Sequence, residues 1–236
     1  MQAEQAFFDD VIDRSAAGFF PTAQASEAAV KGALQVSLIG LDEIDAALRA
    51  EWHDLTESAA TPNPFFALVF LEPAMRHLDP SREVKLCLLR RAETSLLVGL
   101  APVVFQTESS KESSRHACVW THRQCFNGAP LVREGYDVAT YIGLFDWIDT
   151  RPEGASVIRF SMPPFDRAGH LALEEACDLR ERSFRVQGFH PRGTLTTDND
   201  FGGVMSEATS RMDDGLSPED GLIAQVHVPA QRMGGC

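Results

Sequence analysis

The sequence predicts an α/β fold in which short strands and helices alternate along the chain. Residues 83–90 carry apolar side chains at every second position, residues 92–95 are mostly polar, and residues 96–105 are apolar with several β-branched side chains. This pattern predicts a β-hairpin with a turn at residues 92–95. Residues 41–57 instead space their apolar side chains by three and four positions, which predicts an amphipathic helix. The complete expected order is β α α β β β α β α β.

The first ordered elements are expected after a leader. Residues 1–32 show no clean period, whereas residues 34–39 place apolar side chains on one face of a short strand. The helix that follows has one apolar stripe, which consists of Leu41, Ile44, Leu48, Trp52 and Leu55. Trp52 is interpreted as a core residue, with a substrate-stacking role as the alternative. Two prolines within residues 61–64 end this helix, and a shorter helix with Pro73 in its first turns is expected at residues 70–78.

The rest of the chain continues the alternation. Gly99, in the second arm of the hairpin, indicates a bulge or a close backbone approach. Asp137 is a candidate N-cap for a helix that directs Tyr141, Leu144, Phe145 and Trp147 toward the core. The remaining expected elements are a strand at residues 117–121, a turn at 127–130, the helix at 137–147, a strand at 156–161, a helix at 168–181 and a strand at 183–188.

Composition excludes several classes of function. The chain has 236 residues, is 44% apolar and carries a net charge of −13, so it lacks the positive field that attracts nucleic acid or anionic lipid. No apolar run approaches the roughly 20 residues that span a bilayer. Residues 1–10 contain no Lys or Arg and therefore lack the basic start of a secretory signal, so a cytoplasmic location is expected.

One stretch concentrates side chains that could carry chemistry. His116, Cys118, Trp120 and His122 alternate, and Cys125 follows. Ligands at every second position of a strand lie about 6.5 to 7 Å apart, which is too far for one tetrahedral zinc ion, so no metal is expected. A substrate-facing strand and a mixed buried strand remain as alternatives. The five cysteines have no CxxC spacing, which fits reduced thiols.

The same stretch carries a family resemblance. Residues 119–135 read VWTHRQCFNGAPLVREG, which resembles the W-x-H-x-x-C-[FY]-x-G-x-P-L-[VI] motif of CelD/BcsL-like acyltransferases in the GNAT superfamily. Trp52 with Leu55, residues 64–66 and the LVGLAP run at residues 97–102 occur in the order expected for that family. The resemblance covers about residues 34–203.

The resemblance implies a mixed, mostly antiparallel sheet flanked by helices, and transfer of an acyl group from acetyl-CoA or another acyl-CoA to an amine or hydroxyl. It implies a link to cellulose or other exopolysaccharide production and a small-molecule or saccharide acceptor. In such proteins two GNAT-like halves pack together, and the second half holds most of the coenzyme A, with its pyrophosphate at a splayed strand and a helix N-terminus. For the acceptor, side-chain chemistry makes His122 a candidate base or orienting group, Trp120 a stacking platform and Asn127 a hydrogen-bond donor. No residue is assigned to cofactor binding.

The chain departs from this pattern after residue 208, where a complete second unit is expected and the sequence ends at Cys236. Residues 1–32 are therefore predicted to be a poorly ordered leader, residues 33–190 a GNAT-like domain, and residues 191–236 the start of an incomplete second unit or a disordered tail. Two functions stay open. One is a GNAT-type acyltransferase, impaired or inactive as this chain unless a partner chain supplies the missing half. The other is a noncatalytic accessory or binding module without coenzyme A.

Overall fold

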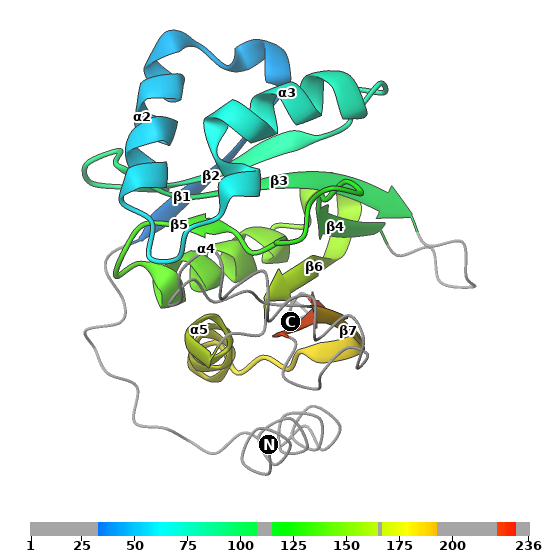
Figure 1. Ribbon diagram of the computed structural model, residues 1–236. Coiled ribbons are helices and arrows are strands. Elements are labelled where there is room, and N and C mark those ends of the chain that lie inside the picture. Colours follow the sequence, from blue (N-terminus) through cyan, green and yellow to red (C-terminus); the bar gives the residue numbers. More distant parts are fainter. Residues whose placement is uncertain (1–32, 108–114, 165–166, 193–220, 230–236) are drawn as a thin grey trace, which may run out of the picture.

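The computed structural model describes residues 33–107, 115–164, 167–192 and 221–229, and its described strands form one mixed sheet (Figure 1). The sheet has eight strands in the order β1-β2-β3-β4-β6-β8-β7, and β5 pairs with β3 beside this path. The strands are β1 (Leu34–Ile39), β2 (Lys85–Arg91), β3 (Leu97–Thr107), β4 (Arg115–Val119), β5 (Leu131–Val132), β6 (Ala155–Pro164), β7 (Arg185–Arg192) and β8 (Gly221–Pro229). Within the described residues, β4 and β6 are the one parallel pair of strands. The predicted α/β class, with a mostly antiparallel sheet flanked by helices, is confirmed.

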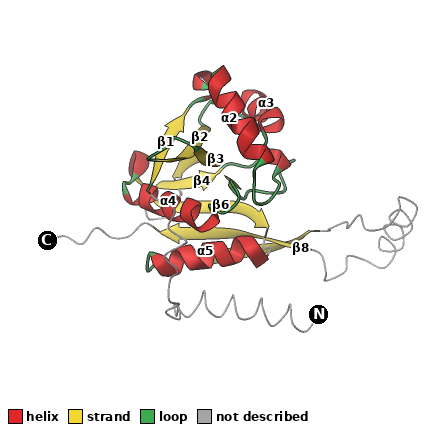
Figure 2. Ribbon diagram, turned by 90° about the vertical axis from the view of Figure 1, so that its left-hand side faces the viewer, coloured by secondary structure: helices red, strands yellow, loops and turns green. Residues whose placement is uncertain are grey.

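Four α-helices of the described residues flank this sheet. Helices α2 (Ala46–Glu57) and α3 (Leu68–Leu78) lie on one face, and α4 (Asp137–Asp149) lies on the other with α5 (Arg167–Leu179) beside it (Figures 1 and 2). Short 3-10 turns at Leu41–Glu43, Pro64–Phe66 and Pro152–Gly154 lead into or out of these elements. In the part of the chain that the structure describes, no helix combines the length and apolar character needed to cross a membrane.

The first helix has the predicted buried stripe. Leu41, Ile44, Leu48, Trp52 and Leu55 are all buried. The α-helix itself starts only at Ala46, because the Asp45 side chain accepts a hydrogen bond from the backbone N–H of Leu48 at 2.8 Å and caps it there. Trp52 is fully buried, and its indole N–H donates to the carbonyl of Phe66 at 2.8 Å. The interpretation of Trp52 as a core residue is confirmed.

The predicted hairpin is also confirmed. Strands β2 and β3 pair antiparallel, and the register shifts between Leu89 and Arg90, opposite Gly99. A Cβ atom at Gly99 would lie 3.0 Å from a methyl of Thr140 in α4 and 3.1 Å from Leu89. Both functions predicted for Gly99, a bulge and a close approach, therefore occur together.

Helix α4 directs Tyr141, Leu144, Phe145 and Trp147 into the core, as predicted. The predicted N-cap is wrong by one residue: Tyr136 occupies the cap position and Asp137 is the first helical residue. A carboxylate in the first turn interacts favourably with the positive end of the helix dipole. Asp137 therefore marks the start of the helix even though it is not the cap.

The end of the chain returns to the sheet. Strand β8 inserts between β6 and β7, and it pairs antiparallel with both. Residues 221–229 belong to the segment 191–236, which is predicted to be a tail or an incomplete second unit, and they lie in the same sheet as the preceding strands. The predicted leader at residues 1–32 lies outside the described residues.

Candidate functional site

Strands β4 and β5 are two halves of one interrupted strand beside β3. Val119 is opposite Val103 and the N–H of Trp120 donates to the carbonyl of Pro102 at 2.8 Å, and pairing resumes where Leu131 meets Leu100. Residues 121–130 leave the sheet between these points, and we call this segment the excursion. Most of the motif that carries the family resemblance lies on it. The alternation predicts a strand through residue 121, whereas the strand ends at Val119.

A single buried side chain fastens the excursion. Asn63, which is only 3% exposed, donates its amide N–H groups to the carbonyls of Ala129 at 2.8 Å and Asn127 at 3.3 Å. Its side-chain oxygen accepts from the N–H of Phe65 at 3.2 Å. The polar break at residues 61–64 therefore does more than end a helix, because it ties the segment after α2 to the far side of the excursion.

The excursion packs against β6 at Gly128. A Cβ atom at this position would lie 1.7 Å from the carbonyl oxygen of Ser161, so only glycine fits. The parallel pairing of β4 with β6 ends at Cys118 and Arg159, two residues earlier on β6. Beyond the point where β4 and β6 stop pairing, the excursion therefore takes the place of β4 beside β6.

A cavity of about 140 Å³ opens where the parallel pair ends. Its polar lining comes from β3, β4, the start of the excursion and β6, and includes Gln106, Cys118, Trp120, Thr121, Arg159 and Ser161. The guanidinium of Arg159 lies 2.9 Å from Nδ1 of buried His116. Because a guanidinium only donates, His116 accepts this bond. We call this space the β4–β6 cavity.

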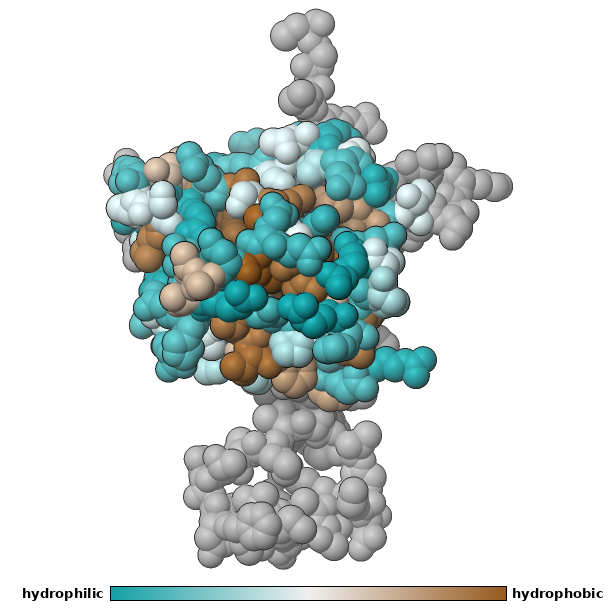
Figure 3. Space-filling view, turned by 90° about the horizontal axis from the view of Figure 1, so that it is seen from above, coloured by the Kyte–Doolittle hydropathy of each residue, from teal (hydrophilic) through white to brown (hydrophobic). Residues whose placement is uncertain are grey.

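Aromatic side chains form a cluster next to this cavity. The rings of Trp120 and His122 have centroids 5.5 Å apart, and His122 stacks on Phe70 of α3 at 5.8 Å. Phe65 meets Phe70 and Phe126 edge to face, at 5.5 and 6.0 Å. Phe70 is 41% and Phe126 50% exposed, so the cluster reaches the surface on the side of α3. The view from above also shows apolar side chains at the surface among polar ones (Figure 3).

The three predicted site residues, Trp120, His122 and Asn127, differ in burial and in hydrogen bonding. Trp120 and His122 are brought together, and both remain partly exposed. In His122, Nδ1 accepts a hydrogen bond from the backbone N–H of Gln124 at 3.2 Å, and the buried Nε2 atom has no hydrogen-bond partner among the described residues. Asn127 is 7% exposed, and its side-chain oxygen accepts from the N–H of Ala129 at 3.0 Å. This bond closes a local turn of the excursion.

Sequence reasoning missed several residues of this site. Asn63, Phe70, Arg159 and Ser161 reach it from three other segments of the chain. The alternation of Arg159 and Ser161 about buried Phe160 signals that both lie on the face opposite α4. The strand register that brings this face to Trp120 has no signal in the sequence.

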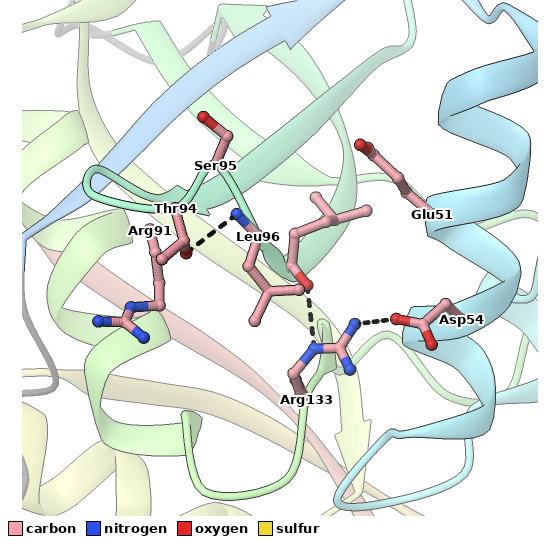
Figure 4. Close-up of a pocket in the computed structure, with 8 residues that line it drawn as sticks. Glu51, Asp54, Arg91, Thr94, Ser95, Leu96 and Arg133 are labelled. Carbon is pink, nitrogen blue, oxygen red and sulfur yellow. Dashed lines mark hydrogen bonds and ion pairs between the residues drawn. The ribbon is translucent and has the colours of Figure 1, made fainter.

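A second cavity, of about 460 Å³, lies between α2 and the turn of the β2–β3 hairpin (Figure 4). Leu96 and Leu97 form its apolar floor, with Glu51, Asp54 and Arg133 at its edge. Arg133 donates to Asp54 at 2.5 Å and to the carbonyl of Leu97 at 3.1 Å. The Arg133 guanidinium thus holds α2 against the start of β3.

Helix α4 begins directly after β5. Because the N-terminus of a helix favours anions, the start of α4 is a candidate position for the pyrophosphate of coenzyme A. Exposed Glu134 and first-turn Asp137 already bring negative charge to the positive end of this helix. The N–H of Glu134 donates to the carbonyl of Ser58 at 2.9 Å, and Arg133 is paired with Asp54. These residues do not fit a pyrophosphate.

In the described part of the chain, no group of three or more His, Cys, Asp or Glu side chains is arranged to hold a metal ion. Burial raises the pKa of the Cys125 thiol, although hydrogen bonds with the backbone of Asn127 and His122 partly oppose the shift. A thiol with a raised pKa is a poor nucleophile at neutral pH, so a Cys125–His122 nucleophile is not supported.

Comparison with known proteins gives structural matches only. No protein-family model matches the sequence, and no curated protein matches it. Among solved structures, a chimera of the spermidine N-acetyltransferase SpeG from Vibrio cholerae with hSSAT is 12% identical, covers 83% of this chain and 96% of its own, and has a TM-score of 0.40. A GNAT-family acetyltransferase from Streptococcus pneumoniae is 8% identical, covers 84% and 100%, and scores 0.42.

A probable acetyltransferase from Staphylococcus epidermidis is 7% identical, covers 84% of this chain and 100% of its own, and has a TM-score of 0.44. TM-scores below 0.5 do not establish a shared fold or activity.

Proposed function

We propose that this chain is the acceptor-binding module of a GNAT-type acyltransferase and that it does not hold acyl-CoA by itself. The observation that carries the proposal is the excursion between β4 and β5, which packs against β6 at Gly128 and borders the small β4–β6 cavity. Ligands of open α/β sheets bind beyond the carboxyl ends of parallel strands, and this cavity lies at the carboxyl ends of the one described parallel pair.

Size argues against coenzyme A in the β4–β6 cavity, and charge argues against its pyrophosphate at the start of α4. Pockets that enclose a whole small molecule measure about 300–1,000 Å³, whereas the β4–β6 cavity measures about 140 Å³. The carboxylates of Glu134 and Asp137 would repel a pyrophosphate at the start of α4. The acyl-CoA would therefore have to come from a second GNAT-like half or a partner chain, as the family resemblance implies.

The aromatic cluster supports binding of an acceptor with flat apolar faces, such as a saccharide. The indole of Trp120 offers a stacking surface, and the neighbouring His122 lies within 5.5 Å of it, ring centroid to ring centroid. In this proposal Trp120 stacks on the ring of the acceptor. His122 has Nδ1 bonded to the N–H of Gln124 and Nε2 buried, so it supports the indole of Trp120 and does not bind the acceptor through a ring nitrogen. Asn127 shapes the excursion and acts on the acceptor only through it. A role in exopolysaccharide production is the corresponding cellular function.

Two other candidates make different predictions. Acyl transfer by this chain alone is favoured by the parallel β4–β6 pair with a cavity at its carboxyl end. A noncatalytic accessory module is favoured by the absence of a suitable pyrophosphate position at α4.

A calorimetric titration of the folded chain with acetyl-CoA separates these candidates, with circular dichroism as the control for folding. We expect no saturable binding at high micromolar ligand, and saccharide binding that is lost in Trp120→Leu. Saturable binding of acetyl-CoA would contradict the proposal and support catalysis by this chain alone. A folded chain that binds neither acetyl-CoA nor any saccharide would leave the accessory module.

A further inference from the structure

We infer that the cavity between α2 and the β2–β3 hairpin binds an α-amino acid with an apolar side chain. Its volume of about 460 Å³ falls within the range of about 300–1,000 Å³ for pockets that enclose a small molecule. Leu97 of its floor begins β3, whereas Trp120 bonds to Pro102, five positions later in that strand and roughly 17 Å away. The cavity is therefore separate from the proposed acceptor site, and neither site depends on the other.

Two arginine bridges fix the walls of this cavity. Arg133 donates to Asp54 of α2 at 2.5 Å and to a backbone carbonyl at the start of β3 at 3.1 Å. Arg90 donates to Glu51 of α2 at 2.5 Å and to the carbonyl of Ser95 in the hairpin turn at 2.8 Å. Because the helix and the hairpin are joined in this way, the cavity is formed before a ligand arrives, which lowers the cost of binding.

The charges in the lining are balanced. Glu51 and Asp54 contribute two carboxylates, and Arg91 and Arg133 contribute two guanidinium groups. Arg91 also pairs with Glu93 at 2.9 Å, beside the cavity. A ligand with a single charge would meet a group of its own sign next to each partner, and such juxtapositions are unfavourable. A zwitterion can match both signs at once.

The pair of Asp54 and Arg133 suits the two charged groups of an α-amino acid. Their printed bonds use Oδ2 of Asp54 and the Nε and Nη2 atoms of Arg133, so Oδ1 and Nη1 make no hydrogen bond to the described residues. An α-amino acid carries its ammonium and carboxylate on one carbon, so it can bond to these two neighbouring groups together. Glu51, three positions before Asp54 on the same helix, keeps Oε1 as a second acceptor for the ammonium. Charge-assisted bonds of this kind are stronger than neutral ones.

The floor of the cavity explains the apolar side chain. Leu96 is 38% exposed, although it is a large apolar residue, and Leu97 beside it is buried. Figure 4 shows Leu96 between Arg91 on one side and Asp54 of α2 on the other. A ligand whose charged end reaches Asp54 and Arg133 can therefore cover Leu96 with its side chain and remove apolar surface from water.

The test titrates the full chain with L-leucine in a calorimeter and compares it with compounds that each lack one of its groups. Isoamylamine lacks the carboxylate, 4-methylpentanoate lacks the ammonium, and glycine lacks the apolar side chain. We expect leucine to bind roughly 10-fold or more tightly than each of them, because each missing group removes a charge-assisted bond or the buried apolar contact. L-Phenylalanine is titrated in parallel as a larger apolar side chain.

Variants locate the site. Asp54→Asn should weaken leucine binding severalfold and reduce its advantage over 4-methylpentanoate, whereas Asp42→Asn, at a carboxylate that pairs with Arg82 outside the cavity, should change neither. Leu96→Glu should abolish leucine binding, because it places a carboxylate on the floor. Leu171→Glu is its matched control, since Leu171 is 48% exposed on α5, away from the cavity. Circular dichroism checks folding, and Leu96→Glu decides the matter if Asp54→Asn does not fold.

Saturable binding of leucine or phenylalanine that is lost in Leu96→Glu would support this site. Binding of neither amino acid would overturn it, as would equal affinity for leucine and either of its singly charged analogues. Leucine binding that is lost in Trp120→Leu and kept in Leu96→Glu would also overturn it, because the ligand would then lie at the proposed acceptor site. The acetyl-CoA and saccharide titrations test the proposed function on other ligands, so failure of one proposal is distinguished from failure of the other.

Discussion

Replacement of Asn63 tests whether the excursion is held in place by this one side chain. Asn63→Ala removes three hydrogen bonds, to the carbonyls of Ala129 and Asn127 and from the N–H of Phe65, at 2.8, 3.3 and 3.2 Å. Each is worth about 1 kcal/mol in net stability, and buried groups that lose a partner cost more than that. We therefore expect the free energy of unfolding to fall by about 3 kcal/mol.

Urea unfolding followed by circular dichroism measures this change. Asn63→Asp keeps an oxygen that accepts from Phe65, but it turns a buried carboxylate oxygen toward two carbonyls, so it should destabilise the fold at least as much as Asn63→Ala. Asn127→Ala removes one local bond within the excursion and should cost about 1 kcal/mol. A loss below about 0.5 kcal/mol in Asn63→Ala, within the range of ordinary surface substitutions, would refute the view that Asn63 fastens the excursion.

Three further predictions concern the core and its thiols. Trp52→Ala should destabilise the fold by roughly 3 to 5 kcal/mol in urea unfolding, because Trp52 is fully buried, and an unchanged midpoint would contradict its place in the core. Gly128→Ala should cost about 1 to 3 kcal/mol, because its methyl group would overlap the carbonyl oxygen of Ser161 and force the excursion away from β6; unchanged stability and unchanged sugar binding would argue against this close approach. Burial, assisted by nearby Asp178, raises the pKa of Cys177 to about 12. The folded state then holds a proton that the unfolded thiol releases near pH 8.5, so this contribution to stability is complete below that pH and is lost as the pH rises toward 12. Urea midpoints measured from pH 7 to 10 should therefore fall more steeply in the wild type than in Cys177→Ala, and parallel pH curves would contradict the raised pKa.

The sequence predicts those parts of the fold that depend on local periodicity. The spacing of Leu48, Trp52 and Leu55 predicts a buried helical face, and the alternation on both arms of the hairpin predicts β2 and β3, since neighbours along the chain determine both patterns. Strand β8 (Gly221–Pro229) is a different case. Its position between β6 and β7 depends on pairing across long separations, which periodicity does not encode.

The candidate site is less predictable for the same reason. Trp120 and His122 stand out because unusual side chains alternate there, but the strand on which they were placed ends at Val119. Asn127 was assigned to a ligand, whereas its side-chain oxygen closes a turn. In the sequence, an asparagine that binds a ligand and one that closes a turn look the same. Only the hydrogen bond from the N–H of Ala129, at 3.0 Å, shows that Asn127 closes a turn.

The insertion of β8 between β6 and β7 has a consequence for how the molecule assembles. Strand β7 has no other strand as neighbour in the described sheet, so it cannot dock until residues 221–229 have been synthesised. Strands β1 to β4 can pair earlier, because each of them neighbours a strand close in sequence. During translation the first half of the sheet can therefore form while β6 still has an open edge. An unpaired strand edge is a template for association with other chains, which makes the interval before β8 arrives the most aggregation-prone stage in the life of this protein.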